Sequence, residues 1–443
     1  MGYKTTLCDV SLDGGHYGIA APAVDFKPGL PAYLRITDIN DDGTLNPSDR
    51  KSVDDSSAGN YLLHEGDIVF ARTGNSTGRN YYYDPRDGEY AYAGFLIKFS
   101  LDPRKINPRY MKYYAQSKQY WDWVSSFNTG STRGNINAKT YASMPIDLLS
   151  RQIQDGIVAI CDAIDDKIRI NRQLNDYLAD FASTVFQNQA SHIEERIALF
   201  DIADIKYGKG LAKNELVEDG YPVFGGNGQI GFYSKYLYEE PQILISCRGA
   251  ASGKVLVSLP KSFITSNSLI IELKDRRYYE YLKQYFMLHQ LYDYATGSAQ
   301  PQITIDGLRH LTVPYPPFDL IKTLTNQLKA ISDCIYSNDI ENQALSRLRD
   351  TLLPKLMSGE IDVSKVDLTQ LTNNHLSGCG SFCSVCCPSG LASEFHEWFR
   401  EHFSLVTVTY AKQIWDGRIC PKDTKEEESC RLVVTVIEVG SKN

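Results

Sequence analysis

Two long segments of the chain carry apolar residues at spacings of three and four positions. In 157–185 the stripe consists of Ile157, Ile160, Ile164, Ile168, Leu174, Leu178, Phe181 and Val185, and in 321–356 it consists of Ile321, Leu324, Leu328, Ile331, Ile335, Leu345, Leu352 and Leu356. Such a stripe is typical of an α-helix with one buried face, and here it is close to a heptad repeat. The pattern predicts two long helices, which we place within 151–196 and 320–362.

Each apolar stripe contains one asparagine at a matching position. Asn171 and Asn342 are 171 residues apart. A polar residue on the seam between paired helices lowers stability but fixes the register of the pair. We therefore expect an antiparallel helix pair in which Asn171 and Asn342 mark a shared register. At 1.5 Å per residue, a helix of roughly 35 residues is about 50 Å long, so the pair would form a rod that holds two domains at a fixed distance.

The rest of the chain alternates short strand patterns with turns. The strand-like segments are rich in Tyr and are separated by Gly, Pro and Asn, and helical stretches occur at 108–125 and 277–294. This mixture predicts an α+β fold for both domains. The expected order is a first domain at 1–150, a central helix at 151–196, a second domain at 197–319, a distal helix at 320–362 and an unassigned tail at 363–443.

An internal repeat relates the two domains. "GDIVFARTGNSTGR" at 66–79 and "QILISCRGAASGKV" at 242–255 are both an apolar strand, a Gly-bounded loop and a basic residue. We pair Arg72 with Arg248, Gly74 with Gly249, Gly78 with Gly253, and Arg79 with Lys254. Further along, "FNTGSTRGNINAKTYASMPI" at 127–146 matches "YATGSAQPQITIDGLRHLTVP" at 294–314 through a shared Thr-Gly-Ser. We expect two similar domains, each followed by a long helix.

The repeated loops carry side chains that are suited to binding DNA. Gly lets the backbone approach a phosphate, Arg binds guanine or phosphate through two hydrogen bonds, and Asn and Gln match the edge of adenine. The candidate DNA-binding residues are Arg72, Thr73, Asn75, Ser76, Arg79, Ser131, Arg133, Asn135, Asn137, Lys139, Arg248, Ser252, Lys254, Ser298, Gln300 and Gln302. The alternative interpretation is a set of tight turns whose basic ends face water. The sequence does not separate base contacts from phosphate contacts.

Composition narrows the possible partners only a little. The net charge of −8 argues against a basic coat for nucleic acid, although a local basic surface is compatible with an acidic average. The 29 tyrosines favour recognition surfaces or, equally, a Tyr-rich core. The sequence has no apolar run long enough to cross a bilayer and no secretory signal, so we expect a cytoplasmic protein without membrane contact.

Two motifs raise the question of catalysis or metal binding. "PYPPF" at 314–318 is similar to the Pro-Pro-aromatic motif of amino-methyltransferases, but Tyr315 replaces the expected Asp, Asn or Ser, and no Gly-rich cofactor loop follows a strand. We interpret it as a rigid junction between a strand and a helix. Cys379, Cys383 and Cys386 have iron–sulfur spacing, but too little chain follows for the barrel that motif needs, and paired CxxC knuckles for zinc are missing. We predict no catalytic residue, metal or cofactor in this chain.

Several of these stretches together resemble the specificity subunit of type I restriction–modification systems. "YLRITDIN" (33–40) followed by "GDIVFARTGNSTGR" is similar to the front of its first target recognition domain. "GYPVFGGNGQIGFYSKYLYEEPQILISCRGAASGKV" (220–255) is similar to the front of the second, and "LLPKLMSGEIDV" (352–363) to the end of the distal helix. The resemblance covers roughly residues 1–370, with the motifs in the family's order. Residues 377–443 depart from that pattern, either as an appended module or, as their mixed composition favours, as an out-of-family reading of downstream sequence.

The resemblance implies a non-catalytic subunit with two target recognition domains. Each domain would read one half of a bipartite site in double-stranded DNA, and the site would be asymmetric because the repeated loops differ in sequence. The helices would set the spacing and dock two modification subunits, which carry S-adenosylmethionine and methylate adenine, and restriction subunits would join to cleave DNA. Two other functions stay open: a self-contained DNA methyltransferase, against which the missing cofactor loop argues, and a protein scaffold whose domains bind no DNA.

Overall fold

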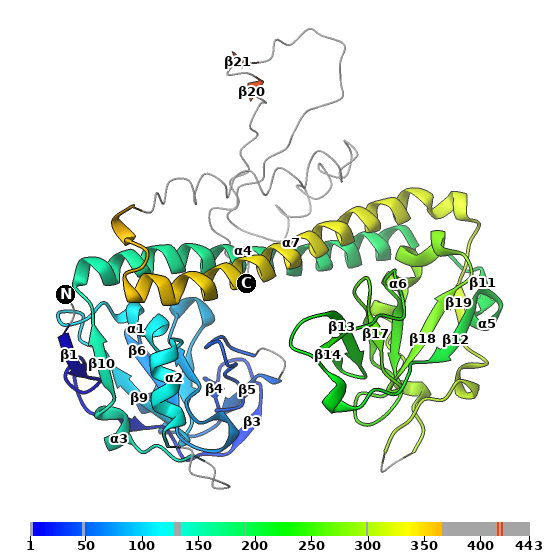
Figure 1. The fold of residues 1–443 in the computed structure, drawn as a ribbon. Helices are drawn as coiled ribbons and strands as arrows, with labels where there is room; N and C mark the ends of the chain where they lie inside the picture. Colours follow the sequence, from blue (N-terminus) through cyan, green and yellow to red (C-terminus); the bar gives the residue numbers. More distant parts are fainter. Residues whose placement is uncertain are drawn as a thin grey trace. The chain divides into compact units, whose positions relative to one another are not determined.

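The computed structural model describes residues 3–46, 49–127, 134–190, 192–297 and 300–365, and the short antiparallel pair β20 (Ile414–Trp415) and β21 (Arg418–Ile419). These residues form two compact units. Unit 1 contains the chain up to Arg169 and resumes at Glu341, and unit 2 runs from Ile170 to Ile340. Each unit is a mixture of strands and helices, as the α+β prediction requires (Figure 1).

The helices agree with the apolar stripes and differ from the shorter predictions. The α-helices of the described chain are α1 (Pro108–Tyr114), α2 (Lys118–Ser125), α3 (Ala138–Ala142), α4 (Arg151–Ala190), α5 (Leu199–Ile202), α6 (Tyr279–Leu288) and α7 (Phe318–Ser358). The stretch predicted at 108–125 is two helices, because the Ser117 side chain accepts a hydrogen bond from Tyr120 N–H and starts α2. Helix α7 ends before Gly359, whose φ of 77° suits a helix C-cap. No described helix is both long and apolar enough to cross a membrane.

Unit 1 is built on three small sheets. Its strands are β1 (Tyr3–Thr6), β2 (His16–Tyr17), β3 (Ala23–Asp25), β4 (Ala32–Leu34), β5 (Lys51–Val53), β6 (Asp67–Ala71), β7 (Asn80–Tyr82), β8 (Tyr90–Tyr92), β9 (Leu96–Ser100) and β10 (Pro145–Leu148). They form an antiparallel sheet in the order β2-β9-β6-β7, a mixed sheet in the order β3-β5-β4-β8, and the antiparallel pair β1-β10.

The central strand β6 separates two apolar clusters in unit 1. Ile68 and Phe70 belong to one cluster, whereas Val69 and Ala71 belong to the other, as the two-residue period of a strand requires. The Phe70 ring stacks on Tyr141 at 4.9 Å between centroids. Several other tyrosines of the first cluster are also fully buried, so part of the tyrosine content is a Tyr-rich core.

Unit 2 repeats this plan with different loops. Its strands are β11 (Arg196–Ala198), β12 (Ala203–Tyr207), β13 (Tyr221–Gly225), β14 (Gly228–Tyr233), β15 (Ile243–Ser246), β16 (Val255–Val257), β17 (Phe263–Ile264), β18 (Ser268–Leu273) and β19 (Thr312–Pro314). The sheet β12-β18-β15-β16 corresponds to β2-β9-β6-β7, and β11-β19 corresponds to β1-β10. The third sheet, β14-β13-β17, contains the parallel pair β13-β17, as the mixed sheet of unit 1 contains β4-β8.

Both long helices pass through both units, and within each unit they pack antiparallel. In unit 1, Asp165 of α4 accepts from Arg349 of α7 (2.8 Å). In unit 2, Asn175 accepts from Asn338 (2.7 Å), and Gln189 donates to Gln327 (3.2 Å). Residue numbers rise along α4 as they fall along α7, which confirms the antiparallel pair.

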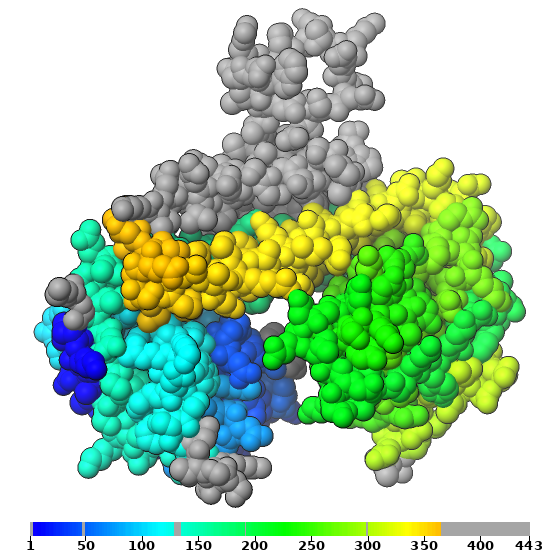
Figure 2. Space-filling model, viewed as in Figure 1, coloured from blue at the N-terminus to red at the C-terminus, as the bar shows by residue number. Residues whose placement is uncertain are grey.

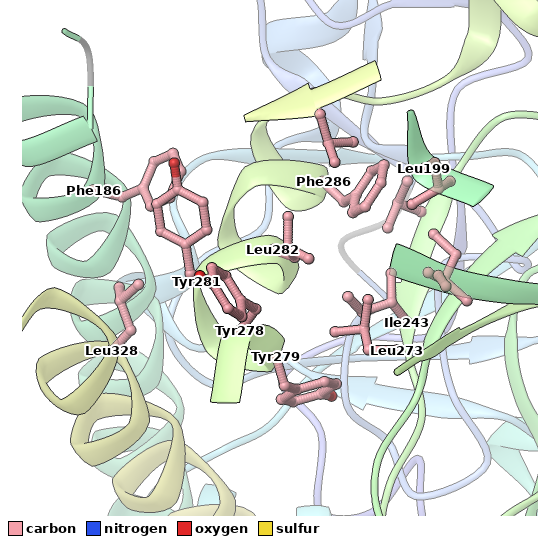
Figure 3. Close-up of a cluster of buried hydrophobic side chains, with 14 of the residues drawn as sticks. Phe186, Leu199, Ile243, Leu273, Tyr278, Tyr279, Tyr281, Leu282, Phe286 and Leu328 are labelled. Atoms are coloured by element: carbon pink, nitrogen blue, oxygen red, sulfur yellow. The ribbon is translucent and has the colours of Figure 1, made fainter. Parts of the chain in front are cut away.

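The helix pair also belongs to the core of each unit. In unit 2, Phe186 of α4 and Leu328 of α7 belong to the same buried cluster as Tyr281 of α6 (Figure 3). In unit 1, Leu353 and Leu356 of α7 complete the core, and Figure 2 shows this end of α7, in orange, packed against the domain. The helices are therefore part of each folded unit as well as the link between units.

The predicted register markers are buried but fall in different units. Asn171 is 2% exposed in unit 2, and Asn342 is 8% exposed in unit 1. The printed contacts across the helix pair come instead from Asn175 and from Lys167, whose Nζ lies 3.2 Å from Glu341. The register role of Asn171 and Asn342 stays a prediction.

Candidate DNA interface

The two repeated loops close with the same hydrogen bonds. In unit 1, Gly78 N–H donates to Ala71 O at the end of β6 (3.0 Å), and in unit 2, Gly253 N–H donates to Ser246 O at the end of β15 (2.9 Å). Both glycines have positive φ, 91° and 98°. A Cβ would lie 2.6 Å from Val124 in unit 1 and 2.5 Å from Tyr292 backbone in unit 2. The position therefore needs Gly for its conformation and for its close packing.

This hydrogen-bond pattern corrects one of the four predicted pairs. Arg72 N–H donates to Phe95 O (3.1 Å), and Cys247 N–H donates to Asn267 O (3.0 Å). Arg72 therefore corresponds to Cys247, and Arg248 corresponds to Thr73, one residue later in the chain. The pairing of Arg72 with Arg248 is wrong, because the buried strand and the loop glycines fix the alignment and the arginine follows neither.

A second stretch, distant in sequence, lies beside each loop. In unit 1, Ile136 N–H donates to Arg72 O (2.9 Å), and Thr73 forms a β-bridge with Asn135. In unit 2, Arg248 forms the same bridge with Gln302, and the next residue, 303, donates its N–H to Cys247 O (3.1 Å). The structure thus brings the predicted loops together in pairs, in the same way in both units.

In unit 1 the candidate side chains divide into exposed and internally bonded groups. Asn75, Asn135 and Lys139 are exposed, and Thr73 is half-buried. Asn137 is exposed, but its side chain accepts from Thr140 N–H (2.9 Å) and caps α3. Ser76 is buried. Arg79 donates to Asp41 (2.7 Å) and to a backbone carbonyl (3.1 Å), so its charge is already paired.

Unit 2 divides in the same way. Arg248, Gln300 and Gln302 are exposed. Ser252 is buried and donates to Pro301 O (2.7 Å), so it holds the two stretches together. Lys254 is half-buried, and its Nζ donates to a neighbouring amide oxygen (3.3 Å). Three further candidates lie outside the described residues: Ser131, Arg133 and Ser298.

A tyrosine that the sequence analysis missed lies beside the loops of unit 1. The guanidinium carbon of Arg72 is 5.0 Å from the centre of the Tyr17 ring. The Tyr17 hydroxyl oxygen accepts from Ala138 N–H at the start of α3 (3.1 Å). Tyr17 therefore joins the first loop to the second, while 42% of it stays exposed.

Tyr207 holds the equivalent place in unit 2 and is also 42% exposed. Each tyrosine precedes a glycine that approaches a neighbouring backbone closely. A Cβ on Gly18 would lie 2.2 Å from a carbonyl oxygen of the neighbouring segment, and the same is true of Gly208. The repeated Tyr-Gly in "HYGIA" (16–20) and "KYGKG" (206–210) was the signal for this position.

The charges at the loops are positive and largely free. Within the described chain, neither Arg72 nor Arg248 forms a salt bridge, and Nε of Arg72 is buried without a hydrogen-bond acceptor. Burial raises the pKa of the Cys247 thiol, so this neighbour of Arg248 stays uncharged. A guanidinium stacked on an exposed ring and lacking an anion is suited to a phosphate or a guanine edge.

The motifs examined for catalysis have structural roles or fall outside the described chain. "PYPPF" joins β19 to α7, where the Tyr278 ring stacks on Tyr315 (4.0 Å) and the Tyr278 hydroxyl donates to Pro316 O (2.9 Å). This is the rigid junction expected from the sequence. Cys379, Cys383 and Cys386 lie outside the described residues. In the described residues, no group of three or more His, Cys, Asp or Glu is placed to hold a metal.

Comparisons with known proteins match this arrangement to one family. The sequence model of the "Type I restriction modification DNA specificity domain" matches twice, at residues 33–179 and 195–348. The MjaIX specificity subunit of Methanocaldococcus jannaschii is 22% identical over 301 residues, which are 58% of this chain and 70% of that protein. The HindI specificity subunit of Haemophilus influenzae is 29% identical over 147 residues, 32% of this chain and 31% of that protein. The structure of an S subunit from M. genitalium aligns with a TM-score of 0.47 at 19% identity, over 80% of this chain and 96% of that one.

Proposed function

The chain belongs to the type I restriction modification DNA specificity family, and from this premise we propose that it selects the DNA sequence on which such a system acts. In this proposal each unit reads one half of a bipartite site in double-stranded DNA. The chain supplies recognition and leaves catalysis to its partners.

One observation carries this proposal: both units bring the same two stretches together by the same hydrogen bonds. The bridges Thr73–Asn135 and Arg248–Gln302 occupy equivalent places. Each place combines backbone, an exposed amide side chain and a basic residue, which are the groups that contact phosphates and base edges. Because the residues differ between the units, the two half-sites differ, and the site is asymmetric.

The partners follow from the same premise. Two modification subunits bind to the chain, carry S-adenosylmethionine and methylate adenine, and restriction subunits complete the cleaving complex. The helix pair docks the modification subunits and sets the number of unspecified base pairs between the half-sites. The presence of a helix pair in each unit supports two equivalent docking places.

The test is to map methylated adenines in a host that expresses this chain with its modification partner. We expect one asymmetric motif in two parts with a fixed gap, and no such motif when the partner is expressed alone. A complex that assembles but methylates or binds without sequence preference would support the scaffold alternative. Isolated chain that binds S-adenosylmethionine and methylates DNA alone would support the methyltransferase alternative.

A further inference from the structure

One position at the candidate DNA interface has opposite chemistry in the two units. Phe95 and Asn267 are structurally equivalent, because each offers its carbonyl oxygen to the first loop, to Arg72 N–H at 3.1 Å and to Cys247 N–H at 3.0 Å. The residue before each is also equivalent, since residues 94 and 266 donate their N–H to the carbonyls of residues 19 and 209. The match covers two consecutive hydrogen bonds and is therefore a match of backbone geometry.

Both side chains face outward beside the loops. Phe95 is 59% exposed and belongs to none of the apolar clusters of the described chain. Asn267 is exposed as well. An exposed Phe with no packing partner gains free energy only when another surface covers it. The surface that the neighbouring Arg72 and Tyr17 are suited to cover is nucleic acid.

We propose that Phe95 and Asn267 are specificity-determining residues, one for each half-site. The proposal rests on the proposed function. Phe95 makes apolar contact with the C5-methyl group of a thymine, and Asn267 forms paired hydrogen bonds with the edge of an adenine, the contacts to which these side chains are suited in the major groove. The same backbone position thus reads a different base in each unit.

Two reciprocal substitutions test this in the full chain assembled with its modification partner. We expect Phe95→Asn to reduce discrimination at one base pair of the first half-site by roughly 10- to 100-fold, and Asn267→Phe to do the same in the second half-site. Both side chains are exposed, so both variants should fold and assemble. Methylation mapping reads out each half-site separately.

Leu12→Asn is the matched control. Leu12 is 60% exposed, and its N–H donates to Ser100 O (2.8 Å). Ser100 is at the opposite end of β9 from Phe95, about 15 Å away at 3.4 Å per residue. This variant should keep the wild-type motif.

A second measurement isolates the methyl group. Duplexes of the mapped motif are made with each thymine of the first half-site replaced in turn by deoxyuridine. One replacement should weaken binding of the wild-type complex several-fold and should not change binding of the Phe95→Asn complex.

An unchanged first half-site in the Phe95→Asn complex would overturn the proposal, and so would the absence of any deoxyuridine effect. Loss of assembly with an unchanged motif would show instead that Phe95 contacts a protein. If the wild-type complex itself shows no bipartite motif, the proposed function fails, which is a distinct outcome.

Discussion

Lengthening both long helices where they pass between the units should widen the gap in the recognised DNA site. The perturbation repeats residues 170–173 in α4 and residues 337–340 in α7. Both helices must change together, because contacts lie on each side of the insertion: Lys167 with Glu341 in unit 1, and Asn175 with Asn338 in unit 2. Equal insertions preserve both sets.

The size of the effect follows from helix and DNA geometry. Four residues add about 6 Å at 1.5 Å per residue, and B-DNA rises 3.4 Å per base pair, so the gap should grow by about two base pairs. Four residues turn a helix by about 400°, roughly 40° beyond a full turn. Two base pairs of DNA turn by about 70°, which leaves only about 30° to be absorbed.

Methylation mapping of the lengthened complex measures the gap directly. Both half-sites should keep their sequences. A control that lengthens α4 alone should assemble poorly, because α7 then cannot keep its contacts in both units. An active complex with both helices lengthened and an unchanged gap would refute the idea that the helices set the spacing.

Three substitutions test individual charges. Arg248→Ala should weaken DNA binding by the assembled complex, at one base pair by about 1–3 kcal/mol if the contact is to a base, or uniformly with a salt slope smaller by about 1 if it is to a phosphate; unchanged binding in salt titrations would remove Arg248 from the interface. Arg79→Ala should lower the free energy of unfolding by at most about 1 kcal/mol and keep the motif, since its charge is paired within the protein; a changed motif would contradict this assignment. Burial raises the pKa of Asp165, but Lys112 and Arg349 lower it further, so the net pKa lies below the usual value. Asp165→Asn should therefore cost about 3 kcal/mol of stability near neutral pH, and urea unfolding should show the difference fading as the pH falls below about 4; a difference independent of pH would contradict the ion-pair explanation.

The long-range plan of the fold was predictable because it is written in local periods. The stripes predict α4 and α7 to within a few residues at most ends, and the loop glycines mark the turns after β6 and β15. The matching Thr-Gly-Ser segments predict that a second stretch follows each loop. These signals are local in sequence, so they survive without knowledge of the tertiary structure.

The contents of the candidate site were less predictable because they depend on strand pairing. Tyr17 and Phe95 lie far from the loop at Arg72 in sequence and reach it only through hydrogen bonds with neighbouring segments. Neither has a periodic pattern of its own. Arg79 and Ser252 fit the loop chemistry, but the fold uses both side chains internally. Sequence alone does not distinguish a donor that is already bonded from one that is available to DNA.

Exchanging one loop for its counterpart tests the central claim, that each unit reads its own half of the site. Residues 134–139 of unit 1 are replaced by residues 301–306, their structural equivalents in unit 2, and methylated adenines are mapped in a host that carries the modification partner. The account predicts that one half of the motif changes while the other half and the gap stay the same. A motif in which both halves change together, or in which neither half changes, would contradict it.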